Sequence, residues 1–225
     1  MTPVLYVGNR NYSSWSIRPW LALAWSGVDF ETRDVELDAD GYGEGRIAAG
    51  AAVSPSGRVP ALGVDGVTIW DSLAICEWAA ERAQGAPLWP QDATERAVAR
   101  SLACEMHSGF AAIRDELPCN IRRRSPTPFL SDAARREVAR IDAILASQAE
   151  RAQGRGPYMF GRRGIVDAFY TPIATRMRSY AIPLGAAAGA YRDALLEDDA
   201  FLRWESEAQA SWKAMSRGDA ETRHR

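Results

Sequence analysis

The spacing of apolar residues changes along the chain and divides it into two parts. Within residues 1–82, short β-prone runs such as 4–7 alternate with segments such as 17–24, whose apolar residues recur at helical spacing. A period of two residues is typical of strands, and a period near 3.6 is typical of helices. The order of strand, helix, strand, hairpin and helix predicts an α/β layer domain.

Start and stop signals set the bounds of these elements. A helix at 15–26 is expected to begin between Ser13 and Ser16 and to end at Gly27, and Asp65-Gly66 is a hairpin signal. We expect strands at 4–7, 31–37, 61–64 and 67–70, and a second helix at 73–82. The glycine-rich segment 41–52 lacks the Gly-Lys-Ser/Thr of a phosphate-binding loop, so we interpret it as a loop or a short irregular helix.

Beyond a Pro- and Gly-rich linker at 83–92, only helical patterns remain. Asp92 and Glu95 form a capping-box pattern, which opens a helix at 93–117. We expect further helices at 131–152, 165–180 and 201–215, followed by a polar tail at 216–225. The sequence therefore predicts a second, all-helical domain at 93–215.

Charge and hydropathy exclude two classes of partner. The chain has 27 Lys and Arg against 29 Asp and Glu and no long basic block, so we expect no nucleic acid. We interpret the basic cluster 122–124 as a solvated loop or helix end, with anion binding as the alternative. No apolar run approaches the roughly 18 residues of a membrane span, and no signal-peptide pattern is visible. We therefore expect a cytoplasmic protein without a membrane anchor.

Cysteine and histidine usage limits metal and disulfide chemistry. Cys76, Cys104 and Cys119 have no C-x-x-C spacing, which favours reduced thiols. Cys76 and Cys104 lie in apolar helical patterns, which are typical of inert core thiols. Because His107 and His224 are the two histidines of the sequence, a histidine-rich metal site cannot be built, and we expect no metal.

The first group of candidate functional residues lies where the first predicted strand is followed by the first predicted helix. Ser13, Ser14 and Ser16 lie at this corner, together with the unpaired N–H groups of a helix N-terminus. Hydroxyls and the positive end of a helix suit a bound anion or thiolate. The corner is therefore the first candidate site.

A second candidate site lies on both sides of the hairpin. A proline at position 60 requires a sheet edge, a strand start or a cis bond, and a cis Val59–Pro60 bond would turn the Val59 backbone toward an extended peptide. Asp71 and Ser72 precede the next helix. They are either an ordinary helix N-cap or a pair that binds the ammonium and carboxylate groups of an amino acid.

Four motifs, in this order, resemble the cytosolic glutathione S-transferases. They are Ser13-Ser14-Trp15-Ser16-Ile17-Arg18, Arg58-Val59-Pro60-Ala61-Leu62, Asp71-Ser72-Leu73-Ala74-Ile75 and Gly161 to Pro172. The first motif is most similar to the zeta class, also called maleylacetoacetate isomerases. The resemblance implies a thioredoxin-like domain at 1–82 that binds glutathione, an all-helical domain at 93–215 that offers a co-substrate pocket, and a homodimer.

The resemblance also implies roles for single residues. Ser13 matches the hydroxyl that donates to the glutathione sulfur, with Ser14 as the reserve. Val59 before Pro60 matches the residue whose backbone pairs with the cysteinyl moiety. The remaining matches are Asp71 and Ser72 for the γ-glutamyl end, Arg58 for the glycyl carboxylate, and Asp167 as a buried N-capping acid that serves folding.

The co-substrate pocket is expected between the two domains. The residues expected to line it are Trp15, Met106, His107, Phe110 and Arg176. The alternative for His107 is a histidine on the helix surface or in the core whose hydrogen bonds are satisfied within the protein. For Arg176 there are two alternatives: its charge is simply solvated on the helix, or Arg178 takes its place in the pocket. Trp15 stands where the zeta pattern carries Cys, and Gly164 stands where the family usually has a capping Ser or Thr.

These features predict an enzyme that activates glutathione as a thiolate for attack on a small electrophile. Glutathione-dependent cis-trans isomerisation and peroxidase activity are variants of this prediction. A non-catalytic glutathione-binding or interaction module is the alternative from another class, because a fold alone does not confer activity.

Overall fold

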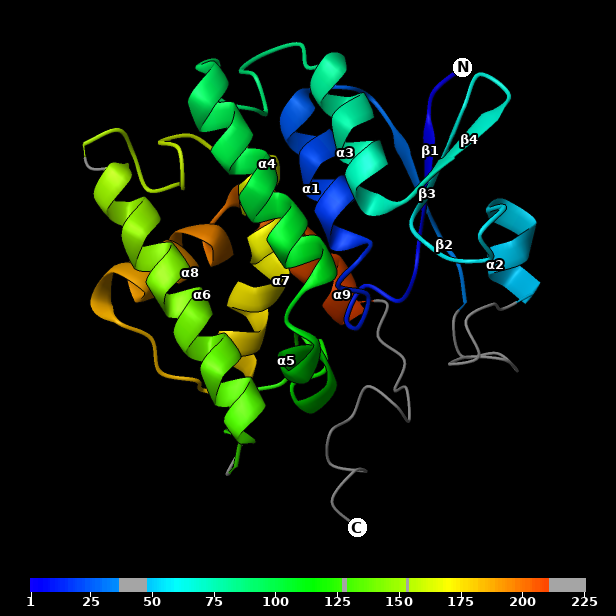
Figure 1. Cartoon of the computed structure of the whole chain (residues 1–225). Coiled ribbons are helices and arrows are strands. Elements are labelled where there is room, and N and C mark those ends of the chain that lie inside the picture. Colours follow the sequence, from blue (N-terminus) through cyan, green and yellow to red (C-terminus); the bar gives the residue numbers. More distant parts are fainter. Residues whose placement is uncertain (37–47, 127–128, 153, 211–225) are drawn as a thin grey trace.

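A four-stranded mixed sheet forms one side of the molecule (Figure 1). The computed structural model describes residues 1–36, 48–126, 129–152 and 154–210. The strands are β1 (Val4–Val7), β2 (Glu31–Asp34), β3 (Ala61–Val64) and β4 (Val67–Trp70). Their order is β2-β1-β3-β4, in which β1 pairs with β2 in parallel and the other two pairs are antiparallel. This arrangement confirms the predicted strands, except that residues 35 and 36 do not continue β2; residue 37 lies outside the described residues.

Two helices lie between this sheet and the rest of the chain. They are α1 (Ile17–Ser26) and α3 (Ser72–Glu81), which contact each other, while the short α2 (Ala48–Val53) lies to the far side of the sheet in Figure 1. The alternating burial of β1 places Leu5 and Val7 in the core, against Leu21 of α1 and Ile75 of α3. Part of the glycine-rich segment, 41–47, lies outside the described residues.

The second part of the chain is helical throughout its described elements. The helices are α4 (Ala93–Ser108), α5 (Ala111–Glu116), α6 (Asp132–Arg151), α7 (Ile165–Ser179), α8 (Ala186–Leu196) and α9 (Asp199–Ala210). Helix α7 is buried along almost its whole length, because α1, α4 and α8 all pack against it (Figure 1). None of the helices in the described part combines the length and hydropathy of a bilayer-spanning segment. The predicted tail at 216–225 lies outside the described residues.

The prediction of one helix at 93–117 is wrong. The chain breaks at Gly109, and Phe110 has a left-handed φ of 62°. A Cβ at position 109 would lie 2.8 Å from the carbonyl oxygen of Glu105, so this close approach requires glycine. Arg114 stabilises the break by donating from Nε to the Gly109 carbonyl at 3.0 Å.

Helix α8 was missed by the sequence analysis. Its sequence, Ala186–Leu196, is rich in alanine and begins after Gly185, so it carries no side-chain cap. Its first turn is instead stabilised from outside, because the Gly185 amide donates to Asp142 of α6 at 2.7 Å. The predicted last helix begins at Asp199 rather than 201, and residues beyond 210 lie outside the described part.

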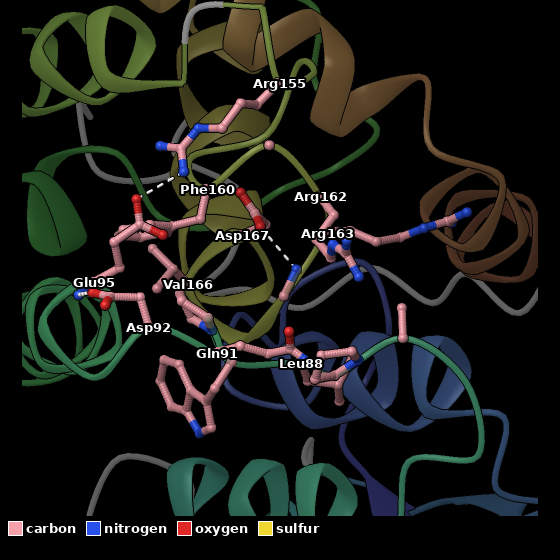
Figure 2. A pocket seen from close by; sticks show the side chains of 16 residues that line it. Leu88, Gln91, Asp92, Glu95, Arg155, Phe160, Arg162, Arg163, Val166 and Asp167 are labelled. Carbon is pink, nitrogen blue, oxygen red and sulfur yellow. Dashed lines mark hydrogen bonds and ion pairs between the residues drawn. The ribbon is translucent and has the colours of Figure 1, made fainter.

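Asp167 connects the start of α7 to the rest of the helical part. It accepts hydrogen bonds from the amides of Gly164 and Met159 and from the Tyr191 hydroxyl. Gly164 has no side chain, so only the Asp167 half of a capping box is present. Figure 2 shows the dashed bond from Asp167 and, nearby, Leu88 of the linker, whose carbonyl accepts from the Ile165 amide at 3.0 Å.

Gly164 is required by the close approach of the linker. A Cβ at this position would lie 2.5 Å from the Leu88 carbonyl oxygen. We therefore expect Gly164→Ala to lower the free energy of unfolding by about 2 kcal/mol, because the linker must move away from α7. Gly85→Ala is the matched control, since a Cβ there meets nothing within 4 Å. Urea unfolding of both variants measures the difference, and equal stabilities would contradict the argument.

Candidate functional site

One cavity brings together the residues on both sides of the hairpin, Trp15 beside the serine corner, and His107 of α4. Its volume is about 330 Å³, and it lies where the hairpin and α3 approach α4. Its lining is Trp15, Ser56, Arg58, Val59, Pro60, Trp70, Asp71, Ser72 and His107. The sequence analysis named all of these except Ser56 and Trp70. Ser56 lies in a polar turn without a distinctive pattern, and the signal for Trp70 was its position directly before Asp71.

The chain turns toward the cavity at the start of β3. The Val59–Pro60 peptide bond is cis, which meets the condition stated for the Val59 backbone. Among the described residues, the amide and carbonyl of Val59, which precedes β3, make no hydrogen bond with the protein. Two backbone polar groups beside the cavity are thus available to an extended ligand.

Asp71 links the N-cap of α3 to α4. Its Oδ1 accepts from the Leu73 amide at 2.8 Å, and its Oδ2 lies 3.2 Å from His107 Nε2. The backbone of Asp71 has a φ of 77°, a conformation that costs an L-residue about 1–3 kcal/mol and is frequent at functional sites. Asp71 is therefore an N-cap, and its second oxygen faces a histidine from the helical part.

Two buried polar atoms beside Asp71 lack protein partners. Ser72 Oγ and His107 Nδ1 make no hydrogen bond in the part of the chain that the structure describes. Buried polar groups are hydrogen-bonded in the great majority of cases, so orphaned ones need an explanation. Both residues belong to the cavity wall.

The serine corner separates Ser13 from Ser14. Ser13 is half-buried, and its hydroxyl donates to Ser16 Oγ at 2.8 Å. Ser16 Oγ also accepts from the Gly8 amide at 3.0 Å. Ser14 is buried and accepts from Arg176 Nη2 at 3.4 Å. Neither Ser13 nor Ser14 is among the residues that line the cavity, and Ser13 is the more accessible of the two.

The expected co-substrate residues divide into two groups. Trp15 and His107 line the cavity, with their rings edge to face at a centroid distance of 5.3 Å. Met106, Phe110 and Arg176 are buried in the core and do not line it. Met106 lies one position from His107 on α4, and a helix turns about 100° per residue, so the two side chains face different ways.

Arg176 and Arg178 both have partners inside the protein. Arg176 donates to the carbonyls of Leu117 and Pro172 at 2.8 and 2.9 Å. Arg178 pairs with Glu205 of α9. Neither is the solvated helix charge that the sequence analysis gave as an alternative for Arg176.

The cysteines are free thiols in the described structure. Cys76 of α3 is buried in the core, and burial raises the pKa of its thiol far above the ordinary range, which agrees with an inert core cysteine. Cys104 is exposed, because it lies on the outer face of α4, so its predicted core position is wrong.

A larger cavity, of about 670 Å³, lies between the linker and the loop before α7 (Figure 2). Its lining includes Leu88, Arg155, Phe160 and Asp167, and it contains none of the residues expected to bind glutathione or co-substrate. Two of its charges, Arg155 and Glu95, pair with each other at 2.7 Å. The smaller cavity is therefore the candidate site.

Comparisons with known proteins agree with this geometry. The family model for the N-terminal domain of glutathione S-transferases matches residues 12–82. The maleylacetoacetate isomerase of Rattus norvegicus is 32% identical over 148 residues, which cover 65% of this chain and 67% of the rat protein. That of Pseudomonas aeruginosa is 42% identical over 108 residues, which cover 46% of this chain and 50% of the bacterial protein. A solved zeta-class structure, a maleyl pyruvate isomerase in its holo form, has a TM-score of 0.68 and 26% identity, and the match covers 93% of this chain and 100% of that one.

The chain therefore belongs to the glutathione S-transferase family, the class that its fold and cavity define. The two curated relatives named above are maleylacetoacetate isomerases, and within the family this chain is zeta-like. The predicted fold class, family and glutathione-dependent enzyme class are confirmed.

Proposed function

We propose that this transferase binds glutathione in the 330 Å³ cavity and activates its thiol as a thiolate. The observation that carries the proposal is the meeting of Val59, Asp71 and Ser72 in one cavity, with the Ser72 hydroxyl buried and unpartnered in the described structure. Glutathione is an extended tripeptide with one ammonium and two carboxylate groups. The cavity offers backbone groups, an acid, a hydroxyl and the guanidinium of Arg58, which fit such a ligand.

Each of these groups has a distinct role in the proposed complex. The Val59 backbone pairs with the cysteinyl moiety, as a strand pairs with an added peptide. Asp71 Oδ2 accepts from the γ-glutamyl ammonium, and Ser72 with the N-terminal amides of α3 binds the γ-glutamyl carboxylate. Arg58 binds the glycyl carboxylate. His107, which already contacts Asp71, connects this binding to the helical part.

Ser13 is proposed as the hydroxyl that donates to the sulfur. A thiol has a pKa near 8.5, so a donor and a helix N-terminus that lower it by about one unit raise the thiolate fraction almost tenfold at neutral pH. The Ser13 hydroxyl donates to Ser16 in the structure. Since hydroxyl hydrogens rotate, Ser16 can donate to Ser13 instead and leave the Ser13 hydrogen for the sulfur. The thiol proton leaves to water.

The second substrate is proposed to be a small electrophile placed beside Trp15 and His107. Proximity to the thiolate then supplies most of the rate, without further acid–base groups. The names of the relatives favour one specific reaction, the glutathione-dependent cis-trans isomerisation of maleylacetoacetate. Trp15, which replaces the cysteine of the zeta pattern, narrows the space for that substrate.

A cytoplasmic homodimer is proposed for the assembled enzyme. Strand β4 is an edge of the sheet, and its Val67 and Trp70 side chains are 60% and 48% exposed. Unpaired apolar edge strands are contact surfaces that proteins rarely leave open. These side chains therefore support a second copy of the chain on this edge.

Binding to immobilised glutathione tests the proposed site. We expect the wild type to be retained on the column and the Asp71→Asn variant to pass through it. Asparagine keeps the α3 cap but removes the charge that pairs with the ammonium. Asp65→Asn is the matched control, since Asp65 is also an aspartate of positive φ but lies in the exposed hairpin turn. Equal retention of both variants would contradict the site.

Turnover then separates the functional classes. Purified protein with glutathione is assayed against maleylacetoacetate, aryl halides and hydroperoxides, with Asp71→Asn as the background. Isomerisation of the first supports the maleylacetoacetate reaction, and conjugation of aryl halides supports a general transferase. Retention on glutathione without turnover of any of the three would favour the non-catalytic binding module.

A further inference from the structure

Arg18 is a buried cation without a partner beside the candidate site. Its side chain has no exposed surface, and all three guanidinium nitrogens lack a hydrogen-bond partner in the described residues. It lies in the first turn of α1, three residues after Trp15 of the cavity wall. Buried arginines are normally paired, so this one requires an explanation.

Two aromatic rings enclose the guanidinium. Its central carbon lies 4.3 Å from the ring centroid of Trp15 and 4.8 Å from that of Phe169 on α7. Such cation–π contacts recover only part of the cost of removing a charge from water. The contacts of Arg18 within the protein therefore do not offset the full cost of burying its charge.

The groups that face Arg18 come from three other helices. Arg114 of α5 and Arg176 of α7 repel its charge, while Asp71 and Cys76, at the start of and within α3, favour it. Arg114 also lies against the Trp15 ring, at 5.1 Å from its centroid. Burial, with Arg114 and Arg176, lowers the pKa of Arg18 to about 9. Arg18 still carries its proton at neutral pH. Three cations, Arg18, Arg114 and Arg176, therefore act here together with one acid, Asp71.

Such a cluster is suited to an anion on the other side of the ring. Trp15 both covers Arg18 and lines the cavity. The guanidinium of Arg18 has no exposed surface, so little water screens its charge on the protein side of the ring. The anion that the proposed function places in this cavity, next to the Ser13 corner, is the sulfur of glutathione.

We propose that Arg18 is a positioning residue of this enzyme, whose unpaired charge acts through Trp15 to favour the anionic sulfur of bound glutathione. This inference rests on the proposed function. Ser13 donates a hydrogen bond to the sulfur, and Arg18 supplies the positive field behind it. The cost of burying Arg18 in the free protein is offset when the anion is present, since charge placed in advance needs no reorganisation.

Neutral substitutions of Arg18 test the inference. In Arg18→Met and Arg18→Gln, the thiol of saturating glutathione is titrated by the ultraviolet absorbance of its thiolate. We expect its pKa to rise by about one unit in both, which lowers the thiolate fraction near neutral pH by up to about tenfold. The melting temperature of Arg18→Met is expected to stay the same or to rise, because an unpaired buried charge is removed.

Arg82→Met is the matched control. Arg82 also lies over a tryptophan, Trp78, at 4.4 Å, but it is on the surface at the end of α3. This variant is expected to titrate like the wild type. A wild-type thiol that titrates like free glutathione would contradict the proposed function itself, before any variant is compared.

Three results would overturn the role of Arg18 while the proposed function stands. The first is a thiol pKa in Arg18→Met equal to that of the wild type. The second is a shift in Arg18→Met that Arg18→Gln does not share, which would indicate an effect of shape. The third is loss of folding or a lower melting temperature in Arg18→Met, which would make Arg18 a packing residue.

Discussion

Ser13→Ala is expected to raise the pKa of the bound glutathione thiol by about one to two units and to lower kcat/KM near pH 6.5 by about 10- to 100-fold. The hydroxyl is the proposed donor to the sulfur, and the side chain lies at the corner before α1, with Ser16 as its partner. Removing it leaves the helix N-terminus and the Arg18 charge, so part of the activation remains. Thiolate absorbance against pH and initial rates against pH measure the two effects.

Ser14→Ala is the matched control for this prediction. Ser14 is adjacent in sequence, but it is buried and accepts from Arg176 at 3.4 Å. Its removal is expected to cost about 1 kcal/mol of stability and to leave the thiol pKa near the wild-type value. The opposite result is a raised thiol pKa in Ser14→Ala and an unchanged thiol pKa in Ser13→Ala. It would make Ser14, and not Ser13, the donor to the sulfur.

Asp167→Ala is expected to lower the free energy of unfolding by about 3–9 kcal/mol, because each buried donor left without an acceptor costs about 1–3 kcal/mol. Three donors lose their acceptor: the amides of Met159 and Gly164, at 3.2 and 2.8 Å, and the Tyr191 hydroxyl, at 2.7 Å. Asp92→Ala is the matched control, since Asp92 is an exposed N-cap with one bond, to the Glu95 amide. It is expected to cost about 1 kcal/mol. Urea unfolding measures both, and similar losses would contradict the central place of Asp167.

Asp167 also makes stability depend on pH. Burial raises its pKa from 3.8 to about 6, against the opposing hydrogen bonds from Tyr191, Met159 and Gly164. The folded protein thus binds the proton more tightly than the unfolded chain. This contribution to stability is complete below pH 3.8 and is lost as the pH rises through about 6. The difference in unfolding free energy between wild type and Asp167→Asn should fall between pH 4 and pH 7, and a flat difference would contradict the shift.

Local signals were sufficient for much of the fold. The Asp65-Gly66 turn predicted the β3–β4 hairpin, and the Asp92 and Ser131 caps predicted the starts of α4 and α6, because both side chains accept from amides three residues on. The signals failed where a tertiary contact replaced them. Helix α8 begins with a cap from Asp142 of another helix, and the break before α5 depends on the packing at Gly109.

The candidate site also has a part that the sequence predicted and a part that it did not. The cavity residues at backbone or cap positions, Val59, Asp71 and Ser72, were predicted because turns and caps leave sequence patterns. The co-substrate residues depended on which face of α4 and α7 turns toward the cavity. Met106, Phe110 and Arg176 lie in the core instead. A helical pattern predicts that a helix has an apolar and a polar face. It does not predict which neighbouring element each face contacts.

The amino-acid sequence by itself determined the α/β and all-helical division, the family and the motifs that line the cavity, because these follow from spacing, turns and caps between near neighbours. Only the tertiary structure decided that His107 contacts Asp71, that Ser14 pairs with Arg176, and that Arg18 lies unpaired between Trp15 and Phe169. Apart from the contact of Arg18 with Trp15, these contacts join residues that lie tens to more than a hundred positions apart. Their charges meet only after the helices pack, when burial removes the water that would otherwise screen them.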